Sequence, residues 1–172
     1  LLGDALGRGM VKRLTGPTAP GTKVTGSKVT GSKVKEAPPQ PVSRSLQHVE
    51  GWKIRVDDRL LGDSAEAATG LRALRFLEAK LVEIKAVVPG PRVKDLQQVT
   101  IVLDLNCGDL GAMQYHPSAG WLKSNGYPEE LAKCVHLPRA ADLPTRRNIN
   151  EQPWVILHEL AHAFHDQYLD FE

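Results

Sequence analysis

The sequence predicts an α+β domain that follows a basic, low-complexity tail. Residues 52–56 alternate apolar and polar side chains, which is the pattern of a half-buried strand. Apolar residues between 71 and 88 recur at spacings of three and four, which is typical of a helix with one buried face. Residues 99–103 form a short, β-branched, nearly all-apolar run, as a buried strand does. Strand and helix signals therefore alternate within one domain, which we place at residues 48–172.

The first 47 residues differ in composition from the rest of the chain. They carry a net charge of +6, against −4 for residues 48–172, and the unit Lys-Val-Thr-Gly-Ser occurs at 23–27 and again at 28–32. Such sequence offers too little apolar surface to offset the entropy of ordering it. We therefore expect residues 1–47 to be a flexible tether. The acidic balance of the body argues against a nucleic-acid partner.

Composition and the chain ends bear on location. The chain is 41% hydrophobic and 24% charged, and no run approaches the roughly 18 apolar residues of a membrane helix, so we expect no transmembrane segment. Leu1 is compatible with the end of a signal peptide, and Met10 is an alternative start. The last residues follow an apolar helical pattern, so we expect a piece of a longer reading frame. A secreted or cell-envelope location is slightly favoured.

Two cysteines do not make a disulfide framework. Separate thiols are the favoured interpretation for Cys107 and Cys134, and a single bridge is the alternative in an exported protein. The C-x-x-C spacing that is typical of zinc ligands is absent. We therefore do not expect the cysteines to bind zinc.

The predicted long helix begins at Asp63-Ser64-Ala65-Glu66, where an N-cap side chain is followed three residues later by a glutamate. Pro89-Gly90-Pro91 ends it, because proline cannot continue a helix. Its buried stripe is expected to comprise Leu71, Leu74, Leu77, Leu81, Ile84 and Val88.

The region after this helix contains two further strands. We expect 99–103 to be a central strand that is buried on both faces. Residues 106–130 are rich in Gly, Pro, Asn and Asp and predict a loop, with Trp121 and Leu122 as an apolar anchor. Residues 133–138 predict an edge strand that a proline closes.

The last helix is predicted to start near Glu151, capped by Asn148 or Asn150. It carries the sequence His158-Glu159-Leu160-Ala161-His162. Positions four apart on a helix lie nearly one above the other, about 6 Å along the axis, so both histidines can reach one cation. The opposite stripe, expected to pack into the core, comprises Leu157, Ala161, Phe164 and Tyr168.

Zinc suits these two imidazoles, because catalytic zinc sites use three protein ligands plus water. Glu159 is turned one residue step away from His158 and His162, which keeps it from ligating but leaves its carboxylate near the water position. There it can take a proton from the water and pass it to the leaving amine. The alternative is a helix whose two histidines hydrogen-bond to neighbouring groups without a metal.

The segment 155–162 resembles the active-site helix of the zincin metallopeptidases. Over about residues 48–170, the chain is also similar to a group of poorly characterised bacterial metallopeptidases, in the segments 49–52, 115–122 and 158–166. The resemblance implies a small, mixed, twisted sheet, with 64–88 as a backing helix and the metal-binding helix beneath the sheet. It also implies that the edge strand near 133–138 lines the cleft and pairs with an extended substrate backbone.

Within the zincins, the sequence favours a gluzincin-like metal site over a metzincin one. A metzincin continues as H-E-x-x-H-x-x-G-x-x-H, and here the glycine and third-histidine positions hold His165 and Tyr168. A gluzincin takes its third ligand from an acid on a later helix. Asp170 and Glu172 lie too far along the helix axis, so we expect that ligand beyond residue 172. The 172-residue chain by itself is then expected to be inactive and to bind zinc poorly.

Two residues that follow the motif and two more distant histidines have less specific patterns. His165 lies seven positions beyond the first motif histidine, about 10 Å away, which is too far to share a metal with it. It is either an outer-shell or substrate-contacting residue or a polar residue on the helix surface. Asp166 either orients the second motif histidine or is a solvated carboxylate. His116 and His136 show no stronger signal than other exposed histidines.

These patterns lead to one favoured function and two alternatives. The first is a zinc-dependent peptidase acting on peptide or protein substrates, with Zn²⁺ on His158 and His162 and with Glu159 as general base and acid. The second is a non-catalytic binding or envelope-associated module on a zincin scaffold that lacks a complete metal site. A weaker third is a metal-dependent hydrolase of a non-peptide amide.

Overall fold

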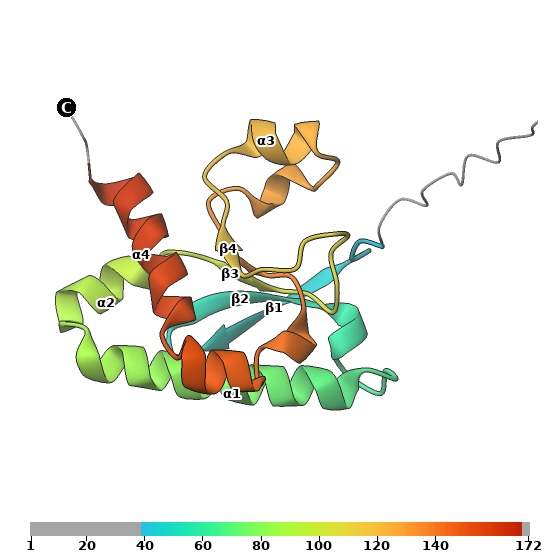
Figure 1. Cartoon of the computed structure of the whole chain (residues 1–172), viewed down its shortest axis with the longest axis horizontal. Helices are drawn as coiled ribbons and strands as arrows, with labels where there is room; N and C mark the ends of the chain where they lie inside the picture. The colour runs from blue at the N-terminus through green and yellow to red at the C-terminus, as the bar shows by residue number, and fades with distance from the viewer. Residues whose placement is uncertain (1–38, 170–172) are drawn as a thin grey trace, which may run out of the picture. The chain divides into compact units, whose positions relative to one another are not determined.

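The structure is a computed structural model that describes residues 39–169 (Figure 1). The predicted tether at 1–47 falls mostly outside the described residues. Its boundary was set too late, because strand β1 (Arg44–Val49) already belongs to the sheet. β1 joins β2 (Trp52–Asp57) through a two-residue hairpin loop in which both residues have positive φ, 53° at Glu50 and 96° at Gly51. The hairpin therefore orders residues that composition assigned to the tail.

The sheet has five strands in the order β1-β2-β3-β5-β4, and it is mixed. β3 (Ile101–Leu103) lies parallel to β2 and to β5 (Val135–Leu137), whereas the outer strands β1 and β4 (Gln114–Tyr115) run antiparallel to their neighbours. The predicted mixed α+β architecture is confirmed at this level.

Two strand predictions have opposite outcomes. β3 is central and fully buried, as predicted for 99–103, although it is shorter than that segment. β5 is not an edge strand, because β4 pairs with it on the side away from β3. The two residues of β4 lie in a segment whose composition predicted a loop. The local sequence therefore did not predict the strand that pairs with the outer side of β5.

Helix α1 (Ala67–Val87) lies along one side of the sheet, and the short helix α3 (Ala119–Ser124) lies on the other (Figure 1). Helix α1 ends before Pro89, as predicted, but it starts at Ala67 without a side-chain cap. The hydroxyl of Ser64 donates instead to the carbonyl of Arg59, 2.7 Å away, so the predicted capping box does not form.

The buried face of α1 is correctly predicted only in its second half. Leu77, Leu81 and Ile84 are buried, but Leu71 is 51% exposed, and Gly70 and Ala73 take the inner positions of the first turns. Gly70 lies so close to Leu60 that an added Cβ would meet its backbone carbonyl. This close approach rotates the inner face by one residue.

The chain between the sheet strands forms short elements that were not predicted. Helix α2 (Gly90–Leu96) follows α1 directly after Pro89. In the 106–130 region, α3 buries Leu122 completely, whereas Trp121 is 49% exposed, so only half of the expected apolar anchor is buried.

Helix α4 (Val155–Tyr168) carries the motif and is continuous through it. It begins four residues later than predicted, because Arg147–Glu151 forms a separate helical turn that closes on itself through Gln152. Asn148 does not cap the helix, since its side-chain amide donates to the carbonyl of Asp142 at 2.6 Å.

The buried face of α4 also differs from the prediction. Ile156, Glu159, Leu160 and Ala163 face inward, whereas Ala161 and Tyr168 are exposed and Leu157 and Phe164 are half-buried. Apolar residues occupy most sides of this helix, so spacing alone could not select the inner face. Contacts of α4 with β4, β5 and α2 select it.

Apolar side chains are buried on both faces of the sheet. The larger core joins β2, β3 and β5 to α1 and α4, and the smaller one gathers Val102, Cys107, Leu110, Leu122, Leu131 and Cys134. Among the described residues, no helix is both long enough and apolar enough to cross a membrane.

Asp166 links α4 to the sheet through hydrogen bonds, and its contribution to the free energy of unfolding should depend on pH. Its carboxylate accepts hydrogen bonds of 2.6 Å from the Tyr115 hydroxyl and from the Lys133 ammonium, and the bond from Lys133 holds the pKa of Asp166 below its ordinary value, with Tyr115 adding to the effect. The stability from this carboxylate is therefore present at neutral pH and is lost as the pH falls through the lowered pKa. We expect Asp166→Asn to lower the free energy of unfolding at pH 7 by about 1 kcal/mol, since the group is partly exposed.

Urea denaturation across pH measures this difference. The difference between the unmodified chain and Asp166→Asn should shrink towards zero near pH 2. This pH is roughly two units below an ordinary aspartate pKa, so the carboxylate becomes protonated there. Asp63→Asn, on an exposed carboxylate without a hydrogen bond in the described structure, is the matched control and should change little. A difference that is constant across pH would contradict the role assigned to the ionised carboxylate.

Candidate metal-binding and catalytic site

The two motif histidines project together from the exposed side of α4. Their Nε2 atoms lie 3.0 Å apart, with the rings perpendicular and their centroids separated by 4.5 Å. Two zinc–nitrogen bonds of ordinary length at a tetrahedral angle would set this separation at roughly 3.3 Å. His158 and His162 are thus spaced to hold one cation between them. The same distance also lets one ring donate a hydrogen bond to the other.

A third ligand does not come from the described part of the chain. Within residues 39–169, no other His, Cys, Asp or Glu side chain joins His158 and His162 in a group of three ligand atoms. Asp170, Glu172 and the predicted ligand beyond residue 172 lie outside the described residues. The expectation of an external third ligand therefore stays a prediction.

Glu159 is buried and fixed in place. One of its carboxylate oxygens accepts a hydrogen bond from the backbone N–H of Tyr115 in β4, at 2.9 Å. This bond links the motif helix to the outer strand of the sheet. Glu159 is therefore held apart from the exposed histidine stripe, and its predicted place near a metal-bound water stays a prediction.

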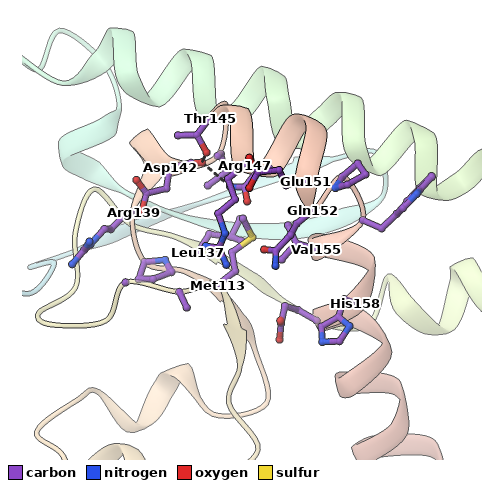
Figure 2. Close-up of a pocket in the computed structure, with 18 residues that line it drawn as sticks. Met113, Leu137, Arg139, Asp142, Thr145, Arg147, Glu151, Gln152, Val155 and His158 are labelled. Atoms are coloured by element: carbon purple, nitrogen blue, oxygen red, sulfur yellow. Dashed lines mark hydrogen bonds between the residues drawn. The ribbon is translucent and has the colours of Figure 1, made fainter.

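A pocket of about 660 Å³ opens beside the motif (Figure 2). His158 and Glu159 form part of its wall, and the loop 111–113, the end of β5 and the turns between 139 and 155 form the rest. Figure 2 shows Arg147 extending into the pocket towards Leu137. The motif thus borders a cavity large enough to take several atoms of a ligand.

His165 and Asp166 lie in the last turns of α4. His165 is exposed. The carboxylate of Asp166 takes its hydrogen bonds from Tyr115 and Lys133, so it positions the helix rather than a motif histidine.

A second group of metal-ligating side chains lies elsewhere, in the protein interior. Asp104, Cys107 and His136 are all fully buried, and one ligand atom from each lies within 4.8 Å of the others. This group could hold a metal ion. Both cysteines are free thiols, as favoured from the sequence. The expectation that neither cysteine binds zinc stays a prediction, although Cys107 belongs to this group of possible ligands.

Hydrogen bonds connect this group to two more residues. Asp104 accepts from His136 at 2.8 Å and from two nitrogens of Arg44 at 2.7 and 2.8 Å, and His136 Nδ1 lies 3.2 Å from His116 Nε2. His116 is only 3% exposed, so both loop and strand histidines are interior residues rather than the exposed ones we expected. The chain Arg44–Asp104–His136–His116 is a continuous polar network.

Burial governs the ionisation of this network. Burial alone would raise the pKa of Asp104, but hydrogen bonds from Arg44 and His136 hold it below its ordinary value. Burial, reinforced by the neighbouring His136, lowers the pKa of His116 to about 4, and burial, together with the charge of Asp104, raises the pKa of the Cys107 thiol to about 11. At neutral pH, Asp104 is therefore ionised, while His116 and Cys107 are uncharged.

The buried group could not be found from the sequence because His136 is far from Asp104 and Cys107 in the chain. Asp104 follows β3 directly and His136 lies in the middle of β5, and only the parallel pairing of these strands brings them together. An acid directly after a buried strand and a histidine inside an apolar run were the available signals. A fixed spacing in the sequence identifies ligands that share one helix. It does not identify ligands that two paired strands bring together.

Breaking the ion pair between Arg44 and Asp104 by removing one partner should be strongly destabilising. Their side chains are 6% and 0% exposed, so removing the cation leaves a buried carboxylate without its main partner. We expect Arg44→Met in the metal-free protein to lower the free energy of unfolding by about 3–5 kcal/mol, as for other broken buried pairs. Arg75→Met, on the exposed side of α1, is the control for urea denaturation. A decrease of less than about 1 kcal/mol in the free energy of unfolding would contradict this prediction, because that is the size expected for a solvent-exposed ion pair.

Comparison with known proteins adds no assignment: no family model, no curated protein and no solved structure matches this chain.

Proposed function

We propose that this chain carries the catalytic helix of a zinc-dependent peptidase. The observation that supports the proposal is the pair of Nε2 atoms of His158 and His162, 3.0 Å apart on the exposed side of a continuous helix. A pocket of about 660 Å³ adjoins this pair, with His158 and Glu159 in its wall. Two adjacent imidazoles, a carboxylate and a cavity are among the parts that a metal-assisted hydrolysis requires, and the third metal ligand is the part that residues 39–169 do not supply.

His158 and His162 would hold the zinc ion through their Nε2 atoms. Zinc supplies Lewis acidity, which polarises the peptide carbonyl and lowers the pKa of an attacking water. Glu159 would accept the proton of that water as the water oxygen attacks the carbonyl carbon. The same carboxylate would then return the proton to the amine nitrogen as the carbon–nitrogen bond breaks.

Tyr115 would position Glu159 for this work. Its backbone N–H engages one carboxylate oxygen, which leaves the other oxygen to act on a proton. Because Tyr115 belongs to β4, its N–H group would hold the proposed general base, Glu159, in a fixed position relative to that strand. Such preorganisation avoids ordering the side chain during the reaction.

The substrate backbone would lie along the loop before β4. The sequence-based proposal used 133–138 for this purpose, but that strand is already paired on both sides. Gly111, Ala112 and Met113 line the pocket, and in the described structure no backbone hydrogen bond from loop or turn engages them. Their free N–H and C=O groups are the groups that an extended peptide needs for pairing.

A non-catalytic binding module is the second candidate. It is favoured by the incomplete set of ligands within residues 39–169 and by the distance between His158 and His162, which also suits a mutual hydrogen bond. Such a module would use the same pocket to hold a peptide without cleaving it.

Glu159→Gln separates the two candidates. Glutamine keeps an acceptor for the Tyr115 N–H, so the fold should survive, but it cannot take the proton. For the protein expressed at its natural full length, we expect kcat for peptide hydrolysis to fall by roughly 10²–10⁴-fold with zinc content unchanged. Glu78→Gln, an exposed position on α1, makes the same change of charge away from the site and should leave kcat within a few-fold.

The assay is cleavage of a fluorogenic peptide library, with and without a chelator and with zinc measured by mass spectrometry. Cleavage that resists both chelation and Glu159→Gln would end the peptidase proposal. Peptide binding without cleavage, retained by Glu159→Gln, would favour the binding module.

A further inference from the structure

We propose that Asp104, Cys107 and His136 form a second metal site, buried in the protein interior, for an ion of the zinc class. It shares no residue with the His158–His162 pair and does not depend on the peptidase proposal. Its three ligand atoms belong to buried side chains and lie within 4.8 Å of one another. The ion would fasten the loop that follows β3 to the middle of β5.

The donor set fits zinc. Thiolate sulfur, imidazole nitrogen and carboxylate oxygen are the three kinds of ligand that zinc accepts in proteins. Around a tetrahedral zinc ion they would be separated by roughly 3.3–3.6 Å. The oxygen of Asp104 and Nε2 of His136 are 2.8 Å apart, so they must open slightly to admit the ion.

The outer partners that metal ligands need are already present. Arg44 donates to both oxygens of Asp104, which fixes the carboxylate. His116 lies against the far nitrogen of His136, at 3.2 Å. With the ion bound, the neutral His136 ring must carry its single proton on Nδ1 instead of Nε2, so the proton count of the ring does not change. Nε2 then gives its lone pair to the metal, and Nδ1–H donates to His116. A second group at the far ring nitrogen is the usual way of orienting a ligating histidine.

The charges balance when the ion is bound. Without it, Arg44 is paired with the carboxylates of Asp104 and Glu130, at 2.7 and 2.6 Å, which leaves one negative charge in excess. Binding of a divalent cation with loss of the Cys107 thiol proton makes this cluster neutral. One proton is released for each ion bound, and no electron moves.

Sulfur ligation distinguishes this site from the motif, where no cysteine is a candidate ligand. The experiment loads the metal-depleted 172-residue chain with Co²⁺ and records the near-ultraviolet thiolate-to-cobalt charge-transfer band. We expect the band in the unmodified chain and in the double variant His158→Ala/His162→Ala. Its absence from the unmodified chain overturns the proposal, and leaves the peptidase proposal untouched.

Two matched cysteine variants identify the ligand. Cys107→Ser should abolish the band, whereas Cys134→Ser should keep it, because Cys134 is equally a buried free thiol but contacts Arg55 and backbone carbonyls instead. The reverse pattern overturns the assignment. His116→Ala should weaken Zn²⁺ binding by roughly 10–100-fold, as loss of an outer-shell partner does.

X-ray absorption of the zinc-loaded, unmodified chain provides a test that needs no variant. We expect one sulfur neighbour of zinc at about 2.3 Å beside nitrogen and oxygen neighbours. A spectrum with nitrogen and oxygen alone means that zinc bypasses Cys107, and this overturns the proposal even if Cys107→Ser fails to fold.

Discussion

Two hydrogen bonds from one residue of the sheet, Tyr115, help to hold the motif helix in its orientation. Its backbone N–H donates to Glu159 and its hydroxyl donates to Asp166, at 2.9 and 2.6 Å. These carboxylates are seven positions apart, or about 10 Å along α4, so two anchors from one strand set the rotation of the helix about its axis. With Glu159 turned inward, His158 and His162 lie on the exposed side of the helix. The chemistry of the exposed side therefore follows from a contact on the buried side.

This constraint explains why the core-facing stripe of α4 was mispredicted. Hydrophobic periodicity assumes that the inner face of a helix is its most apolar one. Here that face includes a carboxylate, which is tolerable because a backbone donor satisfies it. Leu157 and Phe164 end up half-buried at the flank, where the guanidinium of Arg92 lies 5.5 Å from the Phe164 ring. Because a carboxylate occupies the core-facing side of the helix, apolar residues lie at its flank.

Local patterns predicted the elements whose packing is simple. The β-branched run before Asp104 became a buried central strand, and Leu77, Leu81 and Ile84 mark the inner face of α1. The motif helix was predicted as well. Features that depend on distant partners were not predictable: the two residues of β4 exist as a strand only because β5 lies beside them, and Asp104 meets His136 only through the β3–β5 pairing. The hairpin at Glu50 and Gly51 was missed because two positive φ angles there leave little trace in composition.

The parallel centre of the sheet has a consequence for the order of folding. Ile54, Ile101 and Val135 are neighbours across three strands but are widely separated along the chain. Parallel strands cannot be joined by tight turns, so each pairing must first close a long loop and bear its entropy. The hairpin of β1 and β2 and the turns of α1 need no such closure. We therefore expect local structure to form early and the polar interior around His136 to assemble last, in a chain whose non-local pairings slow its folding.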